Sequence, residues 1–465
     1  MPPVVALIFC MILVTVLLLV ERKRNQDASF ALWIPTLWML LCGSKPIGRW
    51  LGTDVILASS RSMEEGSSLD RLALGILIVL ALLVLSRRKI DWFYVKKDNR
   101  WLIILYLFLG LSILWSDFQY VSLKRWIRLS AVTLIGLLIL SERSPLQALE
   151  SVFRRCAYVL IPVSLLLIKY FPGFGIEYVS WSGMKMWVGV TMQKNSLGVL
   201  CGLSAFLIIW TYNRQWRTGN FFKNKMQALA DALVLFLALY LLKGFNGAYS
   251  ATVVGFLIVG IASLFFLYRT KNYSKHIATF IVVVVTVGLL SLSISDSFVS
   301  VVTPIFERNE SFTGRTEIWQ AVRDVATQSP LLGVGYGGYW GLQDTLIYST
   351  LGVREAHSGY LEVYLDVGIA GIILLLAFLL SYYLKTLRFF ENDYDWALFG
   401  ICFLIMTLIE NFTESHFLRT SSYLWNSMVL ITIVFSSRDE DINRPVVPGI
   451  ELLRNANPES YFIEI

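Results

Sequence analysis

Residues 359–384 read GYLEVYLDVGIAGIILLLAFLLSYYL, a run that is almost entirely apolar beyond its first two turns. A helix of this length is long enough to cross the hydrocarbon core of a bilayer, which is about 30 Å thick. Similar apolar runs recur along the 465 residues, of which 56% are hydrophobic and 16% charged. They lie at about 4–20, 28–42, 71–86, 101–115, 126–141, 156–170, 195–212, 227–243, 249–268, 276–292, 396–410 and 421–436. The sequence therefore predicts an all-α, polytopic integral membrane bundle of about 12–13 transmembrane helices with a large extracytoplasmic loop.

Lys and Arg are distributed unevenly between the two sides of this bundle. The loops of one side, which include residues 22–24, 87–89, 269–275 and the pair Arg154 and Arg155, hold the larger share of the 40 basic residues. Because cytoplasmic loops are enriched in Lys and Arg, we expect this side to be cytoplasmic. The N-terminus and the long polar segment 293–358 then lie outside, and the C-terminus lies inside.

The cysteines and the net charge indicate what the chain does not do. The five cysteines, at positions 10, 42, 156, 201 and 402, fall within apolar runs at unrelated spacings. They are expected to be small buried side chains, with no disulfide framework and no metal site. The net charge of +7 follows from the asymmetry of the loops and gives no reason to expect nucleic acid as a partner.

Histidine is rare in this chain, and two of the three, His357 and His416, fall on the outer side. His357 directly precedes the run 359–384, whose first turns carry Glu362 and Asp366 on one helical face. An imidazole titrates near neutrality and therefore suits general-base work. The alternatives stay open: an interfacial histidine bonded to the backbone, and two carboxylates that only favour the helix dipole.

Cations on the outer side are the second candidate feature. Arg315 and Arg323 lie eight residues apart in a stretch with the pattern of a short amphipathic helix at the membrane interface. A guanidinium group binds phosphate oxygens bidentately. Further outer cations are Lys124, Arg125, Arg128, Lys185, Lys194 and Arg419. Because Lys and Arg side chains also extend towards lipid phosphates, each of them taken alone has a purely structural alternative.

Residues 333–338, GVGYGG, have the spacing of a dinucleotide-binding motif. That motif requires a preceding strand and a following helix, whereas Ser329 and Pro330 precede it here. We therefore interpret the segment as a turn. The turn is expected to bring Tyr336, Tyr339 and Trp340 to the membrane surface, where aromatic residues form an interfacial belt or line a sugar site, and we favour the belt.

Three outer-side motifs carry a resemblance to a known family: GRTEIW at 314–319, PLLGVGYG at 330–337 and HSGYLE at 357–362. In this order they resemble the O-antigen ligase and polymerase superfamily, and within it the exopolysaccharide polymerase branch typified by succinoglycan polymerization proteins. WSD at 115–117 and GVTMQKNSLG at 189–198 agree with the same family. The chain then divides into N-terminal transmembrane helices at 1–98, a ligase- or polymerase-like domain at 99–435 with its periplasmic loop 293–358, and a cytoplasmic tail at 436–465.

The resemblance implies a metal- and nucleotide-independent glycosyl transferase, without a cofactor, in the inner membrane of a bacterium. Its expected partners are membrane lipids, a donor glycan on undecaprenyl diphosphate, and an acceptor that is either a glycan or lipid A–core. By matching position, His357 corresponds to the loop histidine that activates the acceptor hydroxyl, and Lys194 and Arg315 correspond to the basic residues that hold the diphosphate. The further predicted site residues are Arg125 and Arg419 for the diphosphate, and Glu362 and Asp366 as supporting carboxylates.

Two questions stay open at this point. A polymerase and an O-antigen ligase differ only in the acceptor, and we favour the polymerase because the similarity to exopolysaccharide polymerases is closer. A transporter or flippase of the same lipid is the alternative from a different class. Such a protein would place polar groups at mid-membrane and show inverted repeats, whereas the sequence shows no repeat and its special residues gather in outer loops.

Overall fold

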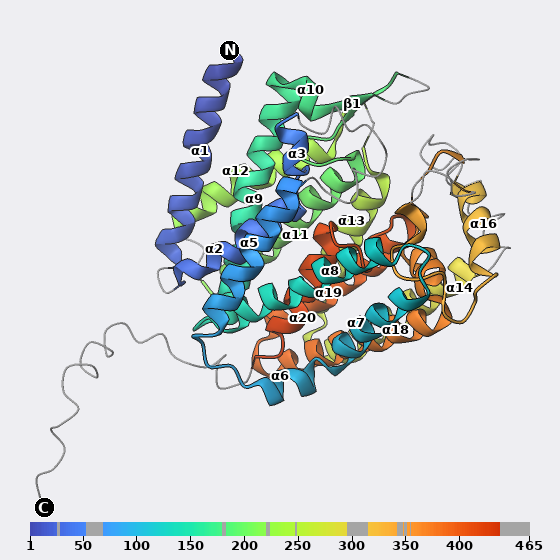
Figure 1. Cartoon of the computed structure of the whole chain (residues 1–465). Helices are drawn as coiled ribbons and strands as arrows, with labels where there is room; N and C mark the ends of the chain where they lie inside the picture. Colours follow the sequence, from blue (N-terminus) through green and yellow to red (C-terminus); the bar gives the residue numbers. More distant parts are fainter. Residues whose placement is uncertain are drawn as a thin grey trace, which may run out of the picture.

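The computed structural model describes residues 1–25, 28–52, 68–178, 183–219, 224–246, 249–294, 315–341, 347, 351–353 and 355–437. Within these residues the chain is a bundle of helices with one short antiparallel hairpin (Figure 1). The first half contains α1 (Pro3–Arg24), η1 (Phe30–Leu32), α2 (Trp33–Cys42), α3 (Ile47–Trp50), α5 (Ser68–Leu85), α6 (Trp92–Asp98), α7 (Arg100–Leu111), η3 (Ser112–Trp115), α8 (Gln119–Leu140), α9 (Pro145–Tyr170), α10 (Pro172–Gly175), β1 (Ile176–Tyr178) and β2 (Lys185–Trp187). The second half contains α11 (Lys194–Arg217), α12 (Lys225–Leu242), α13 (Ala251–Arg269), η4 (Lys271–Tyr273), α14 (Ser274–Ile294), α16 (Arg315–Ala326), η5 (Tyr339–Gly341), α18 (Gly359–Asn392), α19 (Tyr394–Thr413) and α20 (Tyr423–Val434).

Each apolar run predicted from the sequence falls on a helix, and the all-α membrane bundle is confirmed. In the described chain, eight helices are long and apolar enough to cross a membrane, and the pair of α6 with α7 and η3, bent by 77°, brings the number to nine. Three shorter apolar helices, Phe30–Cys42, Ser274–Leu289 and Tyr423–Val434, account for further predicted runs. α8 covers the run 126–141, and its first turns are more polar because they carry Lys124, Arg125 and Arg128.

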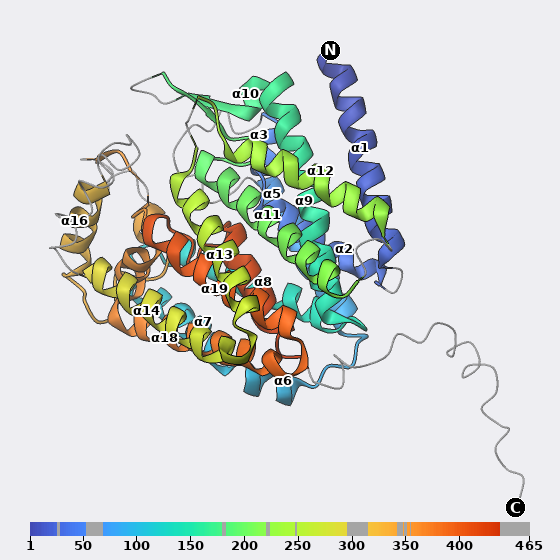
Figure 2. The ribbon, with the colours of Figure 1, turned by 180° about the vertical axis from the view of Figure 1, so that it is seen from behind.

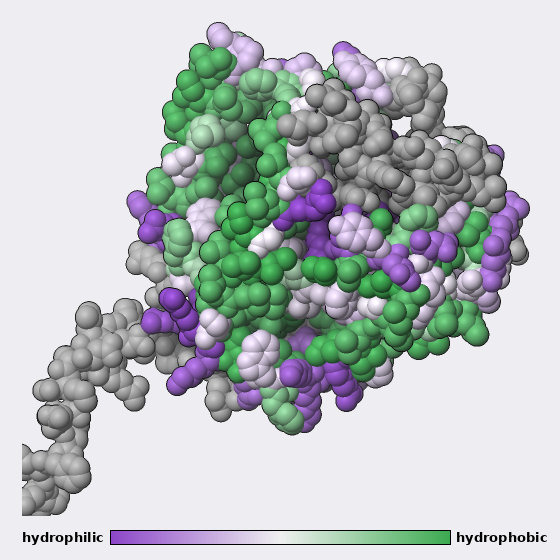
Figure 3. Space-filling view, viewed as in Figure 1, coloured by the Kyte–Doolittle hydropathy of each residue, from purple (hydrophilic) through white to green (hydrophobic). Residues whose placement is uncertain are grey.

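The bundle has a buried centre and an apolar outer surface. The most apolar stretches of α9, α11 and α19 are 83, 78 and 89% buried, against 17% for α1 and 22% for α5. α1 and α5 therefore lie on the outside of the bundle, and α1 stands at its edge in both opposite views (Figures 1 and 2). Apolar side chains cover this edge, and hydrophilic ones gather at the lower end of α1 and around α6 (Figure 3). An outward apolar face between polar margins is what contact with lipid requires.

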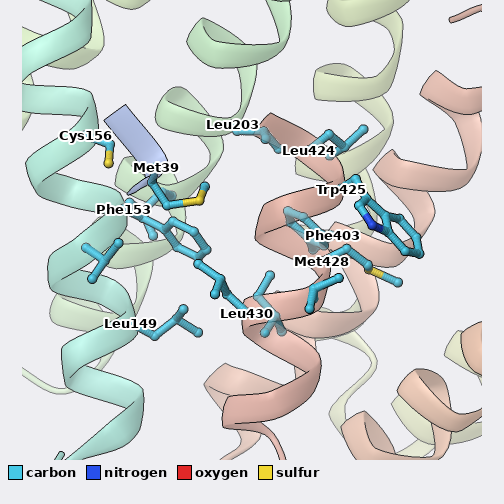
Figure 4. Packing of buried hydrophobic residues seen from close by; sticks show 14 of the residues in the cluster. Met39, Leu149, Phe153, Cys156, Leu203, Phe403, Leu424, Trp425, Met428 and Leu430 are labelled. Atoms are coloured by element: carbon cyan, nitrogen blue, oxygen red, sulfur yellow. The ribbon is translucent and has the colours of Figure 1, made fainter. Parts of the chain in front are cut away.

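Side chains of α2, α9, α19 and α20 fill the centre. Phe153 of α9, Phe403 of α19 and Leu430 of α20 are at most 7% exposed and point towards one another (Figure 4). Cys156 lies in the same layer, and all five cysteines are free and buried, as expected from their apolar surroundings. Because such interiors are close-packed, this layer holds the helices that carry the outer loops in fixed positions.

α18 is broken at Val367 and Gly368, where Gly368 has a φ of 63° and a ψ of −163°. A second segment, residues 330–337, supplies the hydrogen bonds that the break removes. Val334 and Gly335 donate their amides to the carbonyls of Leu365 and Asp366 at 3.0 and 2.8 Å. The amides of Ile369 and Ala370 donate to the carbonyls of Pro330 and Leu331 at 2.9 and 3.1 Å. Irregular backbone at membrane depth requires such partners within the protein.

Residues 333–338 form turns, as expected, but their aromatic side chains do not lie at a membrane surface. Tyr336 and Trp340 are only 3 and 5% exposed, and Tyr336 donates from its hydroxyl to the carbonyl of Leu418 at 2.6 Å. The prediction of an interfacial belt is therefore wrong for these two residues. The docking of this segment onto the break in α18 draws them into the bundle.

Arg154 and Arg155 lie within α9, where we expected a basic loop. They are 2 and 4% exposed, and each pairs with a buried carboxylate: Arg154 with Glu150 and Asp231, Arg155 with Glu21. α1 is thereby tied to α9 by a buried ion pair. The predicted tail 436–465 beyond Ser437 and much of the loop 293–358 lie outside the described residues, and the three-segment division of the chain stays a prediction.

Replacing Gly368 with Ala should destabilise the protein strongly. A Cβ there would lie 2.4 Å from the carbonyl carbon of Leu331, and the positive φ with an extended ψ, a conformation almost restricted to glycine, adds strain of about 1–3 kcal/mol. Gly333→Ala should act alike, since its Cβ would lie 2.4 Å from the amide nitrogen of Val367. We expect the melting temperature in detergent to fall by several degrees for both. Gly75→Ala, which has nothing within 4 Å of its Cβ, is the control, and equal stability of all three variants would contradict the interlock.

Candidate active site

His357 lies in a short turn between the outer loop and α18, and its backbone is strained. Its φ of 47° falls in the left-handed region, which a residue with a side chain seldom adopts. Hydrogen bonds on both sides hold the turn: the Ala356 amide donates to Glu362 at 2.9 Å, and the Ser358 amide donates to the Ser415 hydroxyl at 3.1 Å. Strain that its surroundings maintain in this way is typical of functional sites.

Two carboxylates face the imidazole of His357. Its Nδ1 lies 3.4 Å from Oε2 of Glu414 and 3.6 Å from Oε1 of Glu355. Glu414 follows the last residue of α19, and its side chain is 5% exposed, whereas the imidazole itself is 24% exposed. The site therefore combines a reachable imidazole with two nearly buried carboxylates.

Arginines neutralise these carboxylates. Arg315, the first residue of α16, donates from Nη2 to Oε1 of Glu414 at 2.6 Å. Arg419 donates to Glu355, and also to Oε1 of Glu362 at 3.2 Å. The predicted residues His357, Arg315, Arg419 and Glu362 thus lie together, although they come from three separate parts of the chain.

The start of α11 lies against the same carboxylates. The Asn195 amide donates to Oε1 of Glu414 at 2.5 Å, and the Gln193 amide lies 3.4 Å from Oε1 of Glu355. Lys194 stands between these two residues in the chain, at the first position of α11. The structure therefore places Lys194 next to the His357 cluster.

Arg125 and Asp366 form a neighbouring group at the break in α18. Asp366 accepts a hydrogen bond from the Gly337 amide at 3.0 Å, and Arg125 donates to the Gly337 carbonyl. Both are held by the segment 330–337, and none of their hydrogen bonds described here reaches His357. Asp366 lies on the same helix as Glu362, one turn further on, whereas Arg125 comes from α8.

The charges of the cluster shift its proton equilibria. Burial opposes a charged imidazole, but the carboxylates of Glu355 and Glu414 outweigh it and raise the pKa of His357 above the ordinary 6.5. Burial likewise opposes ionised carboxylates, yet Arg419 and His357 lower the pKa of Glu355. The hydrogen bond from His357 and the charge of Arg315 lower the pKa of Glu414. Both carboxylates are therefore ionised, and His357 is a stronger base than a free imidazole.

A metal ion is the competing interpretation of this cluster. Glu355, His357 and Glu414 each offer one ligand atom, and the three atoms lie within 4.8 Å of one another. However, both carboxylates are already paired with guanidinium groups, Arg419 on Glu355 and Arg315 on Glu414. A divalent cation between them would be repelled by two positive charges. The donor set therefore favours the ion pairs over a metal.

Other outer residues that the sequence singled out have structural partners. α16 buries Ile318, Trp319 and Val322 in a cluster with residues of α18, so this amphipathic helix packs on the protein. His416 has its Nδ1 3.1 Å from the Ser422 hydroxyl and its Nε2 3.7 Å from Glu410, within the turn between α19 and α20.

Glu355, Glu414, Gln193 and Asn195 are the site residues that the sequence did not reveal. Glu355 had one signal, its place two residues before His357, and Gln193 and Asn195 flank the predicted Lys194. Glu414 had none, because a single carboxylate after an apolar run has no characteristic spacing. Its role appears only where α16, α11 and α19 meet.

Comparisons with known proteins agree with the resemblance seen in the sequence. A model of the family described as O-antigen ligase matches residues 232–376, a stretch that contains Arg315, His357, Glu362 and Asp366. The chain is 26% identical over 318 residues to the Exopolysaccharide production protein ExoQ of Rhizobium meliloti (strain 1021), a match that covers 65% of this chain and 69% of that protein. It is 25% identical over 257 residues to an uncharacterized protein of Haemophilus influenzae, covering 50% of this chain and 61% of the relative.

These matches support the O-antigen ligase and polymerase superfamily near the ExoQ branch. They also support a function of the ligase or polymerase type, and with it an enzyme that transfers glycans. Together with the apolar helices they indicate a multi-pass membrane protein.

We expect the cluster to bind no divalent cation tightly. Titration calorimetry of the purified, chelator-treated protein with Zn²⁺, Mn²⁺ and Mg²⁺ should show no stoichiometric binding, because Arg315 and Arg419 already neutralise the carboxylates. The control is Glu414→Gln, which removes one ligand. One equivalent of metal that binds the native protein and is lost in this variant would establish a metal site instead.

Proposed function

We propose that this protein is an inner-membrane transferase that polymerises repeat units of a surface polysaccharide or exopolysaccharide from undecaprenyl-diphosphate-linked glycan. The observation that carries the proposal is the imidazole of His357, which is held on a strained turn between ionised carboxylates, with Arg315 and Arg419 beside it. The similarity to the Exopolysaccharide production protein ExoQ supports the direction of the assignment. The distribution of Lys and Arg supports a periplasmic position for the loop that carries His357.

The proposed reaction is the attack of an acceptor hydroxyl on the anomeric carbon of the donor. His357 takes the proton of that hydroxyl, and the new C–O bond forms as the bond between the anomeric carbon and the diphosphate oxygen breaks. The leaving diphosphate keeps the electron pair and stays on its lipid. Because the polyprenyl diphosphate bond is already activated, the reaction needs no nucleotide, metal or cofactor.

The leaving group needs positive charge, and the cluster has cations in position. Arg315 and Arg419 contact the carboxylates of the His357 site, and Lys194 begins the helix whose neighbouring residues Gln193 and Asn195 reach them. Arg125 of α8 lies at Gly337, beside the break in α18. A guanidinium group has five N–H donors, so Arg315 and Arg419 can bind diphosphate oxygens while each keeps its carboxylate partner. Fixed cations in a site poor in water stabilise developing negative charge more than water does. Glu362 and Asp366 keep the supporting role, Glu362 by holding Arg419 and the Ala356 amide.

An O-antigen ligase is the second candidate. It would use the same donor chemistry and transfer the glycan to lipid A–core. We favour the polymerase because the similar protein of Rhizobium meliloti is an exopolysaccharide production protein. A transporter or flippase of the same lipid is the candidate from a different class, and the broken helix α18 is a feature that some transporters also have.

Deletion of the gene should distinguish polymerase from ligase. With a polymerase, the deletion strain should lose high-mass polysaccharide and retain single repeat units on the carrier lipid. Long polymer that accumulates on the carrier lipid while the outer-membrane lipid stays bare would identify a ligase. Size fractionation of the lipid-linked and free glycans measures either outcome.

His357→Ala should abolish glycan transfer by the purified protein. Loss of a general base typically reduces the rate by about 10²–10⁴-fold, and a loop histidine contributes little to the packing of the bundle. The control is His276→Ala, since His276 is exposed at the start of α14. In reconstituted vesicles given donor and acceptor, translocation of the lipid without any glycosidic product would show that the protein is a transporter.

The pH dependence of the transfer rate should show the effect of the neighbouring carboxylates on the pKa of His357. A base must be neutral to accept a proton, so the rate should rise with pH through a pKa above 6.5. Glu355→Gln removes a negative charge that raises this pKa, and the acid limb of the pH–rate profile should therefore move to lower pH. Glu391→Gln, at an exposed carboxylate, is the control. An acid limb that stays in place or moves to higher pH would exclude His357 as the titrating base.

A further inference from the structure

We propose that Glu414 is the positioning residue for His357: its carboxylate, fixed by Asn195 and Arg315, holds the imidazole in the tautomer whose Nε2 accepts the proton of the acceptor hydroxyl. This inference deepens the proposed function and rests on it for the identity of the reaction. It concerns a residue for which the sequence gave no signal.

Glu414 is the better anchored of the two carboxylates that face His357. Its Oε1 accepts from Asn195 at 2.5 Å and from Arg315 at 2.6 Å, and its backbone carbonyl accepts the Gly359 amide at 3.0 Å. The end of α19 is thus tied to α11, to α16 and to the start of α18. Glu355 lies on the loop, and its Oε1 is 3.6 Å from Nδ1 of His357, whereas Oε2 of Glu414 is 3.4 Å from the same nitrogen. The side chain of Glu355 is 12% exposed, against 5% for that of Glu414.

The partners of Glu414 assign the protons of the imidazole. An ionised carboxylate only accepts hydrogen bonds. In the neutral ring, Nδ1 therefore carries the proton, because Nδ1 is the nitrogen that faces Oε2 of Glu414 and Oε1 of Glu355. Nε2 then has the free electron pair that a general base needs. A carboxylate that orients a catalytic imidazole in this way is established for serine proteases.

The same contacts predict how the substitution Glu414→Gln would change the protonation of the His357 ring. Asn195 and Arg315 both donate, so the carbonyl oxygen of a glutamine would turn towards them. Its NH₂ group would then face Nδ1 of His357 and donate to it. The ring would then carry its proton on Nε2, which removes the electron pair that accepts the substrate proton, or it would turn towards Glu355, which moves Nε2 away from its position for the acceptor hydroxyl.

The test compares Glu414→Gln with Glu355→Gln in the full-length protein in lipid nanodiscs. Each variant is measured at its own pH optimum, so that a shifted pKa does not count as a loss of rate. For Glu414→Gln we expect kcat to fall by about 10²–10⁴-fold with a donor KM within about twofold, because the bound diphosphate is held by other groups. For Glu355→Gln we expect a much smaller loss of kcat, because Glu355 lies farther from Nδ1 of His357 and is more exposed than Glu414.

Nitrogen NMR shows which imidazole nitrogen of His357 carries the proton, a property that would not change if Glu414 had a purely structural role. The chain has three histidines, so ¹⁵N-histidine labelling with a His357→Ala reference spectrum identifies the His357 signals. At a pH where the ring is neutral, the native protein and Glu355→Gln should show the proton on Nδ1. Glu414→Gln should show an increased fraction of the Nε2–H form, and Glu391→Gln should match the native spectrum.

The outcomes separate this inference from the proposed function. Equal kcat losses in the two variants, or an unchanged tautomer in Glu414→Gln, would overturn the role of Glu414 even if transferase activity is established. Absence of transfer by the native protein would overturn the proposed function, while the tautomer shift would still report the contact. If Glu414→Gln does not fold, Asn195→Ala decides: kcat should fall about tenfold at constant donor KM, and a native kcat would overturn the inference.

Discussion

In a hydrocarbon environment no water is present to form hydrogen bonds with the backbone groups that a broken helix leaves without partners. The candidate site depends on how this chain supplies those partners from within the protein. α18 breaks at Val367 and Gly368, and residues 330–337 supply the missing backbone partners on both sides of the break. The two segments approach so closely that both contact points are glycines, Gly333 and Gly368. The same docking fixes Asp366 and Arg125 at Gly337 and leaves the first turns of α18 rigid. These turns carry Glu362, which holds the His357 turn.

Charge compensation is the second requirement of a bundle this apolar, and the chain meets it in two places with different results. Towards one end of α9, Arg154 and Arg155 are almost fully buried with Glu150, Asp231 and Glu21, and they join α1 and α12 to the core. At the outer cluster, the imidazole of His357 and the side chain of Arg419 are each 24% exposed. A buried pair that excludes solvent stabilises a fold only when both partners remain. An ion pair that a ligand can reach leaves guanidinium N–H groups that can also bind a phosphate.

The proposed chemistry follows from this contrast. A glycan transferase that works on a diphosphate lipid needs a base for the hydroxyl and cations for the leaving group, and it needs them in one place. Here the base stands on a strained turn, and its carboxylate partners are themselves held by arginines from α16 and from the segment between α19 and α20. Each group therefore restrains the next. Such preorganisation is the main source of electrostatic catalysis, since fixed charges need not reorient during the reaction.

The sequence by itself determined the architecture and predicted part of the candidate site. Hydropathy is a local property, so every apolar run could be assigned to a helix, and the motif from His357 to Glu362 identified the turn and its helix. The burial of Tyr336 and Trp340 was not predicted, because it follows from the docking of residues 330–337 onto a break in α18 that no local pattern announces. Glu414 was missed for the same reason. Its partners Arg315 and Asn195 lie 99 and 219 residues away in the chain. Only the packing of α11, α16 and α19 brings these groups together, since the contact that gives a carboxylate its role is a property of the assembled bundle.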